Sequence, residues 1–262
     1  MEATQAIDAV IITGAGRGLG RAIALRFGAA HIPVLCIART DRAASTRNEI
    51  IASGGAAESC EVDLAQPQVV EDCISRWIGE RPYKRIGVVL AAAVLGDGGG
   101  LAEANLSDWS RTFNTNVLGN LAVVRALLPR MLTAKFGRVV TLAGGGAAYA
   151  YPLFSAYAIS KAAMVRATEN LQAELRDRGD FSTVCLAPGA METSMLQQVR
   201  AAGGEVRTVV PMDEAVAFIW EFLQAPSCAF SGRFVHVRDD WRSWLGLAAL
   251  EDDRWLLRRL EK

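Results

Sequence analysis

The sequence predicts an α/β protein built on one doubly wound parallel sheet in a single domain. Short apolar runs rich in β-branched residues alternate along the chain with longer stretches of helical period. Strands that are apolar throughout are typical of parallel sheets covered by helices on both faces. No internal repeat, low-complexity tract or linker divides the 262 residues, and one α/β domain can reach that length.

The expected elements follow from this alternation, since apolar runs bounded by turn residues predict strands and apolar residues at helical spacing predict helices. The expected strands are Ala9–Ile12, Pro33–Ala38, Glu58–Val62, Gly87–Ala91, Gly137–Leu142, Phe181–Leu186 and Gly232–Val237. The expected helices are about Leu19–Ala29, a helix capped by Asp41 or Ser45 and ending near Ala52, Gln68–Ile78, Ser107–Leu132, Ser155–Arg178 and Asp213–Leu223. Residues 1–238 form the predicted domain, with a substrate loop at about 190–212, and residues 239–262 form a C-terminal extension of it or a subunit interface.

Charge and hydropathy restrict the class of partner. Hydrophobic residues make up 51% of the chain and the mean hydropathy is +0.19, which provides for a large core. The 28 basic and 28 acidic residues give a formal net charge of zero, without the basic field typical of nucleic-acid binding. We expect a small-molecule substrate and no nucleic acid, and charge does not oppose oligomerisation.

Cysteine usage and the absence of targeting signals predict a soluble, cytoplasmic protein. The five cysteines form no C-x-x-C pair and predict reduced thiols packed in the core; they are Cys36, Cys60, Cys73, Cys185 and Cys228. The first eight residues are too polar and too few for a signal peptide. Charged residues interrupt every apolar run before the roughly 18 residues of a membrane span. The two histidines are isolated, so we expect no metal site.

A glycine-rich turn, Thr13-Gly14-Ala15-Gly16-Arg17-Gly18-Leu19-Gly20, joins the first strand to the first helix. Glycine allows the backbone to approach a pyrophosphate closely, and the helix N-terminus supplies free N–H groups. An ordinary tight turn would also use glycine, but this position after a buried N-terminal strand favours dinucleotide binding. The candidate cofactor contacts are Gly14, Gly16, Arg17, Gly18, Leu19 and Gly20.

The end of the second strand indicates which dinucleotide binds. A preference for NAD normally uses an acidic residue there, which accepts a hydrogen bond from the ribose 2′-OH. This chain has Arg39 instead, and Arg39 can pair with a 2′-phosphate. Arg17 can approach the same phosphate. Either arginine alone could be a solvated surface residue, but together, with the acid missing, they favour NADP(H).

Tyr157 and Lys161 lie four residues apart near the start of a predicted helix and therefore share a face. A lysine ammonium beneath the phenol would lower the tyrosine pKa from its usual value of about 10. Such a phenol can exchange a proton with a carbonyl or alcohol while a hydride moves. The pair alone is common by chance, but after the glycine turn it becomes the strongest chemical signal in the chain.

These motifs resemble those of the short-chain dehydrogenase/reductase family. The resemblance rests on four segments in the family's order and approximate spacing, and it covers about Val10 to Thr193; the segments are the turn TGAGRGLG, Asn114-Thr115-Asn116-Val117, the Tyr157/Lys161 pair and Pro188-Gly189-x-x-x-Thr193. It implies a Rossmann-like seven-stranded sheet, a nicotinamide cofactor, and a homodimer or homotetramer.

The resemblance also implies catalytic roles. Tyr157 would be the general acid/base, and Lys161 would hold the nicotinamide ribose and depress the Tyr157 pKa. Asn116 resembles the asparagine that extends the proton relay through a water.

Further positions would bind the cofactor. Asp63 and Leu64 resemble the pair that brackets the adenine ring. Thr193, after Pro188 and Gly189, resembles the residue that anchors the carboxamide and pyrophosphate side of the cofactor. A threonine that merely starts a surface loop is the alternative.

Two positions depart from the family pattern. The fourth strand ends in Ala91-Ala92-Ala93 where the family has Asn-Ala-Gly, which affects structure more than chemistry. The substrate-polarising serine, thirteen residues before the tyrosine, is Gly144 here. Losing one such donor typically costs about 10²–10³ in rate.

Several groups could replace the serine. The backbone N–H groups of Gly145 and Gly146 lie next to it in sequence. Side-chain candidates are Tyr149, Tyr151 and Ser155, although Ser155 fits a helix cap better than a catalytic donor.

We therefore predict an NADP(H)-dependent oxidoreductase that interconverts a carbonyl and an alcohol, acting on a medium-sized, partly apolar substrate. The alternatives are a catalytically weak or silent NADP(H)-binding scaffold or sensor, and a cofactor-retaining dehydratase or isomerase. In the C-terminal extension, Trp241, Trp244 and Trp255 occur among arginines and suggest a subunit interface more than core.

Overall fold

Parallel strands form one continuous sheet in the computed structural model, which describes residues 7–206, 208–225, 228–245, 247, 250 and 256. Within these residues the sheet has seven strands in the order β3-β2-β1-β4-β5-β6-β7. The strands are β1 (Ala9–Thr13), β2 (Val34–Ala38), β3 (Ala57–Glu61), β4 (Ile86–Leu90), β5 (Phe136–Leu142), β6 (Asp180–Ala187) and β7 (Arg233–His236). The predicted fold class is confirmed, and the ends of the strands differ from the expected ones by one residue at most.

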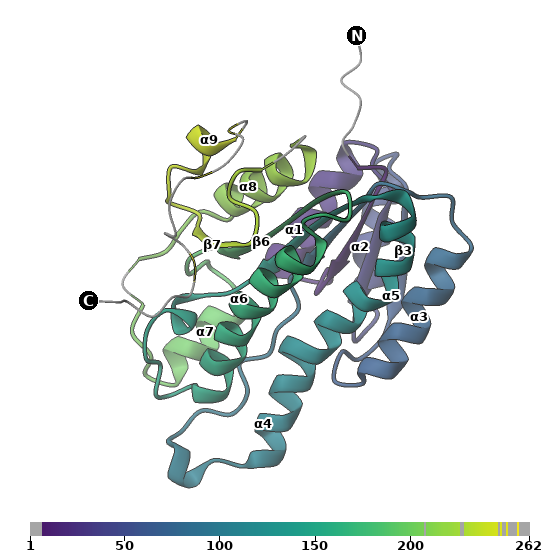
Figure 1. The fold of residues 1–262 in the computed structure, drawn as a ribbon. Helices are drawn as coiled ribbons and strands as arrows, with labels where there is room; N and C mark the ends of the chain where they lie inside the picture. The colour runs from purple at the N-terminus through teal and green to yellow at the C-terminus, as the bar shows by residue number, and fades with distance from the viewer. Residues whose placement is uncertain are drawn as a thin grey trace.

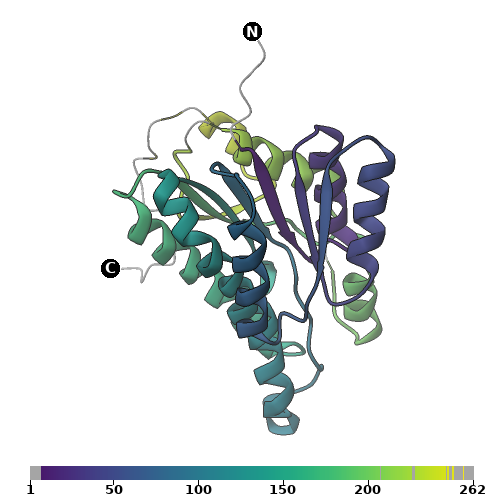
Figure 2. The same cartoon turned by 90° about the vertical axis from the view of Figure 1, so that its right-hand side faces the viewer.

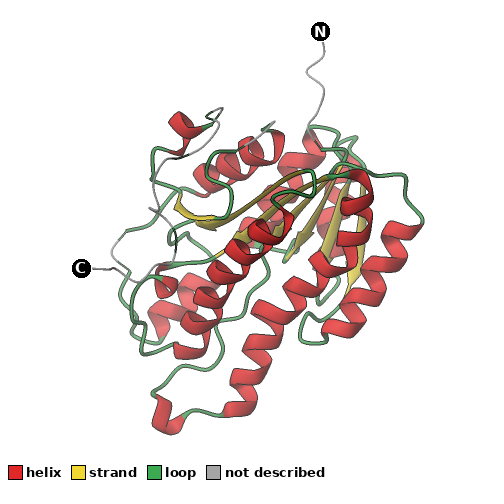
Figure 3. Cartoon of the chain, viewed as in Figure 1, coloured by secondary structure: helices red, strands yellow, loops and turns green. Residues whose placement is uncertain are grey.

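Helices cover both faces of this sheet (Figures 1 and 2). Helices α1, α2 and α8 contribute to one buried apolar cluster, and α3, α5 and α6 contribute to the other. The helices are α1 (Gly18–Ala29), α2 (Arg42–Ala52), α3 (Pro67–Gly79), α4 (Leu106–Phe113), α5 (Gly119–Ala134), α6 (Ser155–Leu175), α7 (Ser194–Ala201), α8 (Met212–Gln224) and α9 (Trp241–Trp244). Figure 3 shows the sheet enclosed by these helices.

The two-sided burial explains why β1 and β2 are almost wholly apolar. Ile12 and Cys36 pair in register and belong to the cluster under α1 and α8. Ile11 and Leu35 pair one position earlier and belong to the cluster under α3 and α5. Because successive side chains point to opposite faces, every position along these strands is buried against one helical layer or the other.

The strand order reverses between β1 and β4, which both leave the sheet at the same edge. Parallel α/β sheets bind ligands outside the carboxyl ends of the strands at such a switch point. Thr13, at the end of β1, accepts a hydrogen bond from Ala92 N (3.0 Å) and donates to Asn120 Oδ1 (2.8 Å). Asn120 in turn donates to Ala92 O (3.0 Å), so this network joins the two strand ends where the family's Asn-Ala-Gly is missing.

A π-helical turn, Asn114–Leu118, interrupts the expected helix between α4 and α5. The resulting run reaches beyond the sheet at the bottom of Figures 1 and 2. Within the described part of the chain, Leu106–Ala134 is the one segment long and apolar enough to cross a membrane, contrary to the expectation that no run would be. Half of its most apolar window is buried inside the protein.

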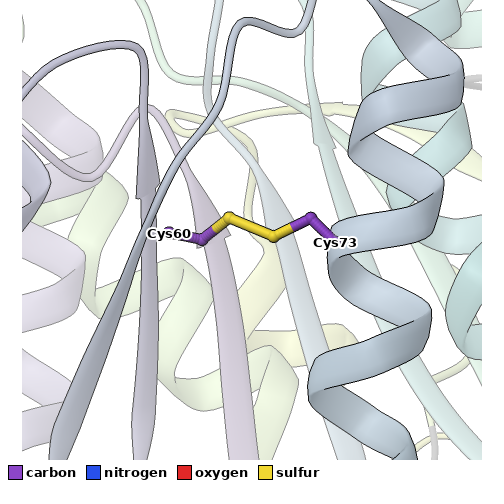
Figure 4. Close-up of a disulfide and its surroundings, with 2 residues drawn as sticks. All are labelled: Cys60 and Cys73. Carbon is purple, nitrogen blue, oxygen red and sulfur yellow. A yellow bond between two sulfur atoms is a disulfide. The ribbon is translucent and has the colours of Figure 1, made fainter.

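Two cysteines form a disulfide, which corrects the expectation of thiols throughout. Cys60 lies on β3 and Cys73 on α3, the helix that follows it (Figure 4). Their separation of 13 residues in sequence gave no motif, and only the packing of α3 beside the sheet edge brings them together. The other three cysteines are free and buried, as expected. With this pair bonded, cysteine usage no longer supports a reducing compartment.

The C-terminal extension contributes to the core of its own chain. Trp241 is buried, its ring packs edge-on against Phe218 at 4.8 Å, and its indole N–H donates to Val237 O (3.1 Å). Trp244 packs against Phe230. For Trp241 the core is therefore the correct interpretation and the interface is not; Trp255 lies outside the described residues.

The helices were predicted more accurately than the residues that cap them. Asp41 precedes α2 but its side chain makes no capping bond, and Ser45 Oγ donates to Asp41 O. Ser155 begins α6 after the cap residue Phe154, and its hydroxyl donates to Pro152 O. Both serines therefore bond carbonyls in place of the helix N–H groups that a cap would satisfy.

Candidate active site

The glycine turn is shaped by close backbone contacts. Gly14 has φ +69°, and a Cβ built there would lie 2.9 Å from Ala92 Cα. A Cβ on Gly20 would lie 2.4 Å from Gly14 O. Gly18 has φ +53°, and the one described neighbour of a Cβ there is Thr193 Cγ2 at 3.5 Å. The turn is thus tightly packed at Gly14 and Gly20 and open at Gly18, where Thr193 faces it.

Helix α1 presents a free N-terminus at this turn. Arg17 occupies the cap position in an extended conformation, without a side-chain capping bond, and the first turn contains no acidic residue. The N–H groups and partial positive charge of a 12-residue helix are therefore available to an anion. This fits a pyrophosphate between Gly18 and Thr193.

Three arginines lie in the glycine turn or directly after β2. Arg17 and Arg39 are both exposed, which fits a phosphate ligand and a solvated surface residue equally. Arg42 was not predicted: a Cβ built on Gly16 would lie 2.6 Å from Arg42 Cβ, so the first residue of α2 packs against the turn. Its position three residues after Arg39 was the signal that could have identified it.

Asp63 and Leu64 follow β3, as predicted, but have different surroundings. Asp63 is partly exposed, accepts a hydrogen bond from Ala65 N (3.0 Å) and lies 4.0 Å from Arg111 Nη2. Leu64 is buried, and its carbonyl and side chain lie against Gly119. The structure thus leaves only Asp63 with an accessible side chain.

Tyr157 and Lys161 lie on one face of α6, near the end of β5. Lys161 Nζ lies 5.5 Å from the centre of the Tyr157 ring and donates to Leu142 O (2.9 Å), the last residue of β5. Lys161 is 3% exposed. The hydrogen bond therefore fixes a buried ammonium beside the phenol.

Burial decides the protonation of this pair. It raises the pKa of Tyr157 to about 12, with a further contribution from the neighbouring Tyr151, and lowers the pKa of Lys161 to about 8. The expected lowering of the tyrosine pKa by the lysine is not met in the protein alone. Desolvation disfavours the charged form of each group and outweighs their attraction.

Asn116 lies in the π-helical turn and is fully buried. Its side chain accepts from Val94 N (2.8 Å) and donates to Val94 O (2.9 Å) and Ser160 Oγ (3.0 Å). It thus joins the loop after β4 to the residue next to Lys161. Its side-chain bonds are structural, and Ser160, which sequence reasoning did not single out, is their partner on α6.

The position of the expected serine is directly beside the tyrosine hydroxyl. A Cβ built on Gly144 would lie 3.5 Å from Tyr157 Oη and within 4 Å of nothing else among the described residues. Gly144 is extended, so any residue could adopt its backbone conformation. Its lack of a side chain is therefore a feature of the sequence that the fold does not require.

Tyr157 packs against an apolar cluster. Its residues come from the loop after β4, the segment before α6, α6 itself, and α7 with the loop that follows it; they are Leu95, Tyr151, Phe154, Tyr157, Met195, Val199 and Val206. The glycine loop at 96–100 is exposed, and Gly99 N donates to Leu153 O (3.0 Å), next to Phe154 of this cluster. The predicted substrate loop thus supplies one wall of a largely apolar site.

Pro188, Gly189 and Thr193 follow β6 at the same edge of the sheet. Gly189 has φ +75°, and a Cβ there would lie 2.5 Å from Val210 Cγ2. Thr193 caps α7, since its hydroxyl accepts from Leu196 N (3.3 Å) and donates to Met191 O (3.2 Å). Thr193 both starts α7 and faces Gly18, so a role in starting this segment is compatible with a role in anchoring the cofactor.

Comparisons with known proteins agree with this geometry. The family model described as short chain dehydrogenase matches residues 8–203. A short chain dehydrogenase of Pseudocercospora fijiensis is 28% identical over 88% of this chain and 80% of its own length. The 1-deoxy-11-beta-hydroxypentalenate dehydrogenase of Streptomyces exfoliatus is 32% identical over 82% of this chain and 79% of its own.

A solved structure shares the fold. A protein from Beutenbergia cavernae, assigned as an NAD(P)-dependent gluconate 5-dehydrogenase and crystallised with NADP bound at low occupancy, has a TM-score of 0.80 and 26% sequence identity. The match covers 90% of this chain and 96% of that one.

Proposed function

Because the chain belongs to the short-chain dehydrogenase family, we propose that it is an NADP(H)-dependent oxidoreductase that interconverts a carbonyl group and an alcohol. The observation that supports this most directly is the Tyr157 hydroxyl at the carboxyl edge of the sheet, with Lys161 buried beside it. The glycine turn lies at the same edge.

The residues of the turn fit the cofactor. The backbone from Gly14 to Gly20 and the free N-terminus of α1 would hold the pyrophosphate, and Thr193 would close over it. The accessible Asp63 side chain would border the adenine, with the buried Leu64 behind it, and Pro188 and Gly189 would border the nicotinamide side. When bound, the nicotinamide supplies or accepts the hydride.

Arg17 and Arg39 would hold the 2′-phosphate that distinguishes NADP(H) from NAD(H). Both are exposed, and the residue directly after β2, where a carboxylate would bind a ribose 2′-OH, is Arg39. Arg42 adds a third positive charge beside the turn. A guanidinium can bind a phosphate with two parallel hydrogen bonds, which a hydroxyl cannot match.

Tyr157 would transfer the proton that accompanies the hydride. With a pKa of about 12 it keeps its proton at neutral pH, so the form that can donate to a carbonyl oxygen is the abundant one. Lys161, largely protonated below pH 8, would stabilise the phenolate left after donation and hold the ribose. Asn116 would fix the loop after β4 against this pair.

The substrate would be a ketone or secondary alcohol with a medium-sized apolar body. The walls next to Tyr157 are aromatic and aliphatic. The pentalenate dehydrogenase named above acts on a hydroxyl-bearing substrate, as its name states. We further propose a homodimer or homotetramer in the cytoplasm, with no nucleic-acid or membrane partner.

The test is a panel of apolar ketones with NADPH. We expect substrate-dependent NADPH oxidation that Tyr157→Phe reduces by at least about 10²-fold in kcat, the usual contribution of a positioned acid. NADPH binding, measured by fluorescence titration, should be retained, because the phenol hydroxyl is one of many cofactor contacts.

Tyr149→Phe is the matched control, since Tyr149 is 78% exposed and outside the apolar cluster. Full activity of Tyr157→Phe on a ketone that the native protein reduces would disprove the mechanism. Product masses separate the alternatives: a dehydratase product loses water, and a silent binder converts nothing.

A further inference from the structure

We propose that Tyr151 donates the second hydrogen bond to the substrate's carbonyl oxygen, in the role that the family gives to a serine and this chain leaves to Gly144. The inference rests on the proposed carbonyl chemistry of Tyr157. It adds a catalytic residue that lies outside the Tyr157–Lys161–Asn116 set.

The need for a second donor follows from Gly144. A Cβ at this position would lie 3.5 Å from Tyr157 Oη, so a serine there would place its hydroxyl next to the proton donor. Glycine contributes no side-chain donor. A preorganised donor aimed at a developing oxyanion is typically worth about 10²–10³ in rate, so its loss without replacement would leave a poor catalyst.

Tyr151 contacts the triglycine segment at Gly146 and the loop after α7 at Gly204. Its Cβ lies 3.6 Å from a Cβ built on Gly146, and its hydroxyl lies 3.6 Å from a Cβ built on Gly204. Its ring packs at 5.5 Å against Phe154. Tyr151 therefore extends from the triglycine segment to the loop after α7, within the apolar cluster that also contains Tyr157.

Gly146 makes this placement possible. A Cβ there would lie 3.1 Å from Ala158 Cβ, a contact tighter than normal packing, and would also approach Tyr151. The triglycine segment thus does two things at once. Gly144 removes the usual hydroxyl, and Gly146 lets the triglycine segment pack closely against Ala158 of α6 and beside the Tyr151 side chain.

The Tyr151 hydroxyl is free to donate. It makes no hydrogen bond to any residue that the structure describes. Burial raises its pKa above the usual value, so it keeps its proton wherever Tyr157 works. The two phenols are close enough that charge on Tyr151 raises the pKa of Tyr157. Both residues belong to the same apolar cluster, so a substrate that packs against this cluster and reaches Tyr157 Oη can meet Tyr151 as well.

The other side-chain candidates are placed less favourably. The Ser155 hydroxyl donates to Pro152 O, which engages its proton. Tyr149 is 78% exposed. The Gly145 and Gly146 amides donate to no described residue and are the one remaining source of a donor, which the experiment below distinguishes.

The first measurement is Tyr151→Phe with the ketone that the native protein reduces. We expect kcat to fall by about 10²-fold with a much smaller change in KM, because the donor acts mainly on charge that develops in the transition state. Circular dichroism and NADPH titration check that the variant folds and binds cofactor. Tyr149→Phe, two residues away, should keep the native kcat.

The second measurement restores the serine. Gly144 is extended with open space around its Cβ, so Gly144→Ser fits the fold. In the Tyr151→Phe background it should recover at least about tenfold in kcat, whereas in the native background it should change kcat by less than about threefold. Gly144→Ala in both backgrounds measures the effect of added volume alone and should recover nothing.

The inference is overturned if Tyr151→Phe keeps the native kcat while Tyr157→Phe loses it, which would assign the donor to the glycine amides and leave the proposed function intact. It is also overturned if the lost kcat is not recovered by serine, or is recovered equally by alanine. Retention of activity in Tyr157→Phe would instead count against the proposed function itself.

Discussion

At Tyr157, burial favours the protonated phenol, and this affects the two reaction directions differently. With a pKa near 12, the side chain is a ready acid for ketone reduction. Alcohol oxidation needs the phenolate, whose population grows as pH rises. The spacing of four residues predicted that Tyr157 and Lys161 share a helix face, but it could not predict that Lys161 is buried and Tyr157 half-buried. Desolvation of the phenol reverses the expected direction of the tyrosine pKa shift.

Lys161 gives a prediction for stability. Its folded pKa of about 8 lies below the usual 10.5, so the unfolded chain binds the proton more tightly between these values. Burial of the ammonium therefore lowers the free energy of unfolding, by its full amount below pH 8. This destabilisation decreases as the pH rises towards 10.5. Lys161→Met removes it. The variant should therefore unfold with a higher free energy than the native protein at pH 7. We expect this advantage to shrink by about 2 kcal/mol between pH 7 and pH 10.

Urea unfolding at the two pH values measures this difference. Tyr157 titrates in both proteins and largely cancels. A difference in unfolding free energy that is the same at pH 7 and pH 10 would show that Lys161 carries no strained charge.

The position of Gly144 could be predicted from the sequence, but the choice of Tyr151 as the replacement donor could not. Counting thirteen residues back from Tyr157 located Gly144, and the 3.5 Å approach to Tyr157 Oη supports that alignment. The sequence alone did not show which candidate donor replaces the missing serine. Exposure and hydrogen bonding separate Tyr151 from Tyr149 and Ser155, and both depend on how the segment between β5 and α6 folds back on the site.

At the scale of elements, the two turns that follow β1 and β2 form the predicted cofactor-selective region. Each strand delivers an exposed arginine, Arg17 or Arg39, to the same sheet edge. The start of α2 adds Arg42 against Gly16. The segment after β2 also contains Asp41, but the three arginines outnumber it, so the region keeps a net positive charge that favours a 2′-phosphate.

Removing these charges should change cofactor preference. We expect Arg39→Ala and Arg17→Ala each to weaken NADPH binding by about 10- to 100-fold, the worth of a charged hydrogen bond, and to leave NADH binding nearly unchanged. Arg42→Ala should act in the same direction. Fluorescence titrations with both nucleotides measure the ratio of dissociation constants.

Arg21 on α1 offers the matched control, because it is paired with Glu49 (2.5 Å) and its removal should affect neither nucleotide. Equal losses for NADPH and NADH in Arg39→Ala would contradict the assignment of Arg39 to the 2′-phosphate.

Elements were predicted well where periodicity alone decides them. All seven strands and the long helices were found. The π-helical turn at Asn114–Leu118, helix α7 and the Cys60–Cys73 bond were not predicted. Each depends on tertiary contacts: Asn116 bonding to Val94, the substrate loop packing over the site, and α3 lying beside β3.

At the scale of the whole molecule, parallel strands bring distant segments to one edge. The glycine turn, Asn116, Gly144, the Tyr157–Lys161 pair and Thr193 all follow strand ends or lie beside them. Their order in sequence made the grouping predictable, since carboxyl ends of parallel strands share an edge. The placement of the C-terminal segment was not predictable, because an aromatic residue such as Trp241 fits a core and an interface equally well by composition.

The central claim is hydride transfer from NADPH to a carbonyl with Tyr157 as proton donor. NADPH dideuterated at the nicotinamide C4, incubated with an apolar ketone, tests it most directly by mass spectrometry of the product. The account predicts an alcohol that carries one deuterium on its carbinol carbon, formed by the native protein and nearly absent with Tyr157→Phe. An alcohol without the label, or labelled alcohol formed at the native rate by Tyr157→Phe, would contradict it.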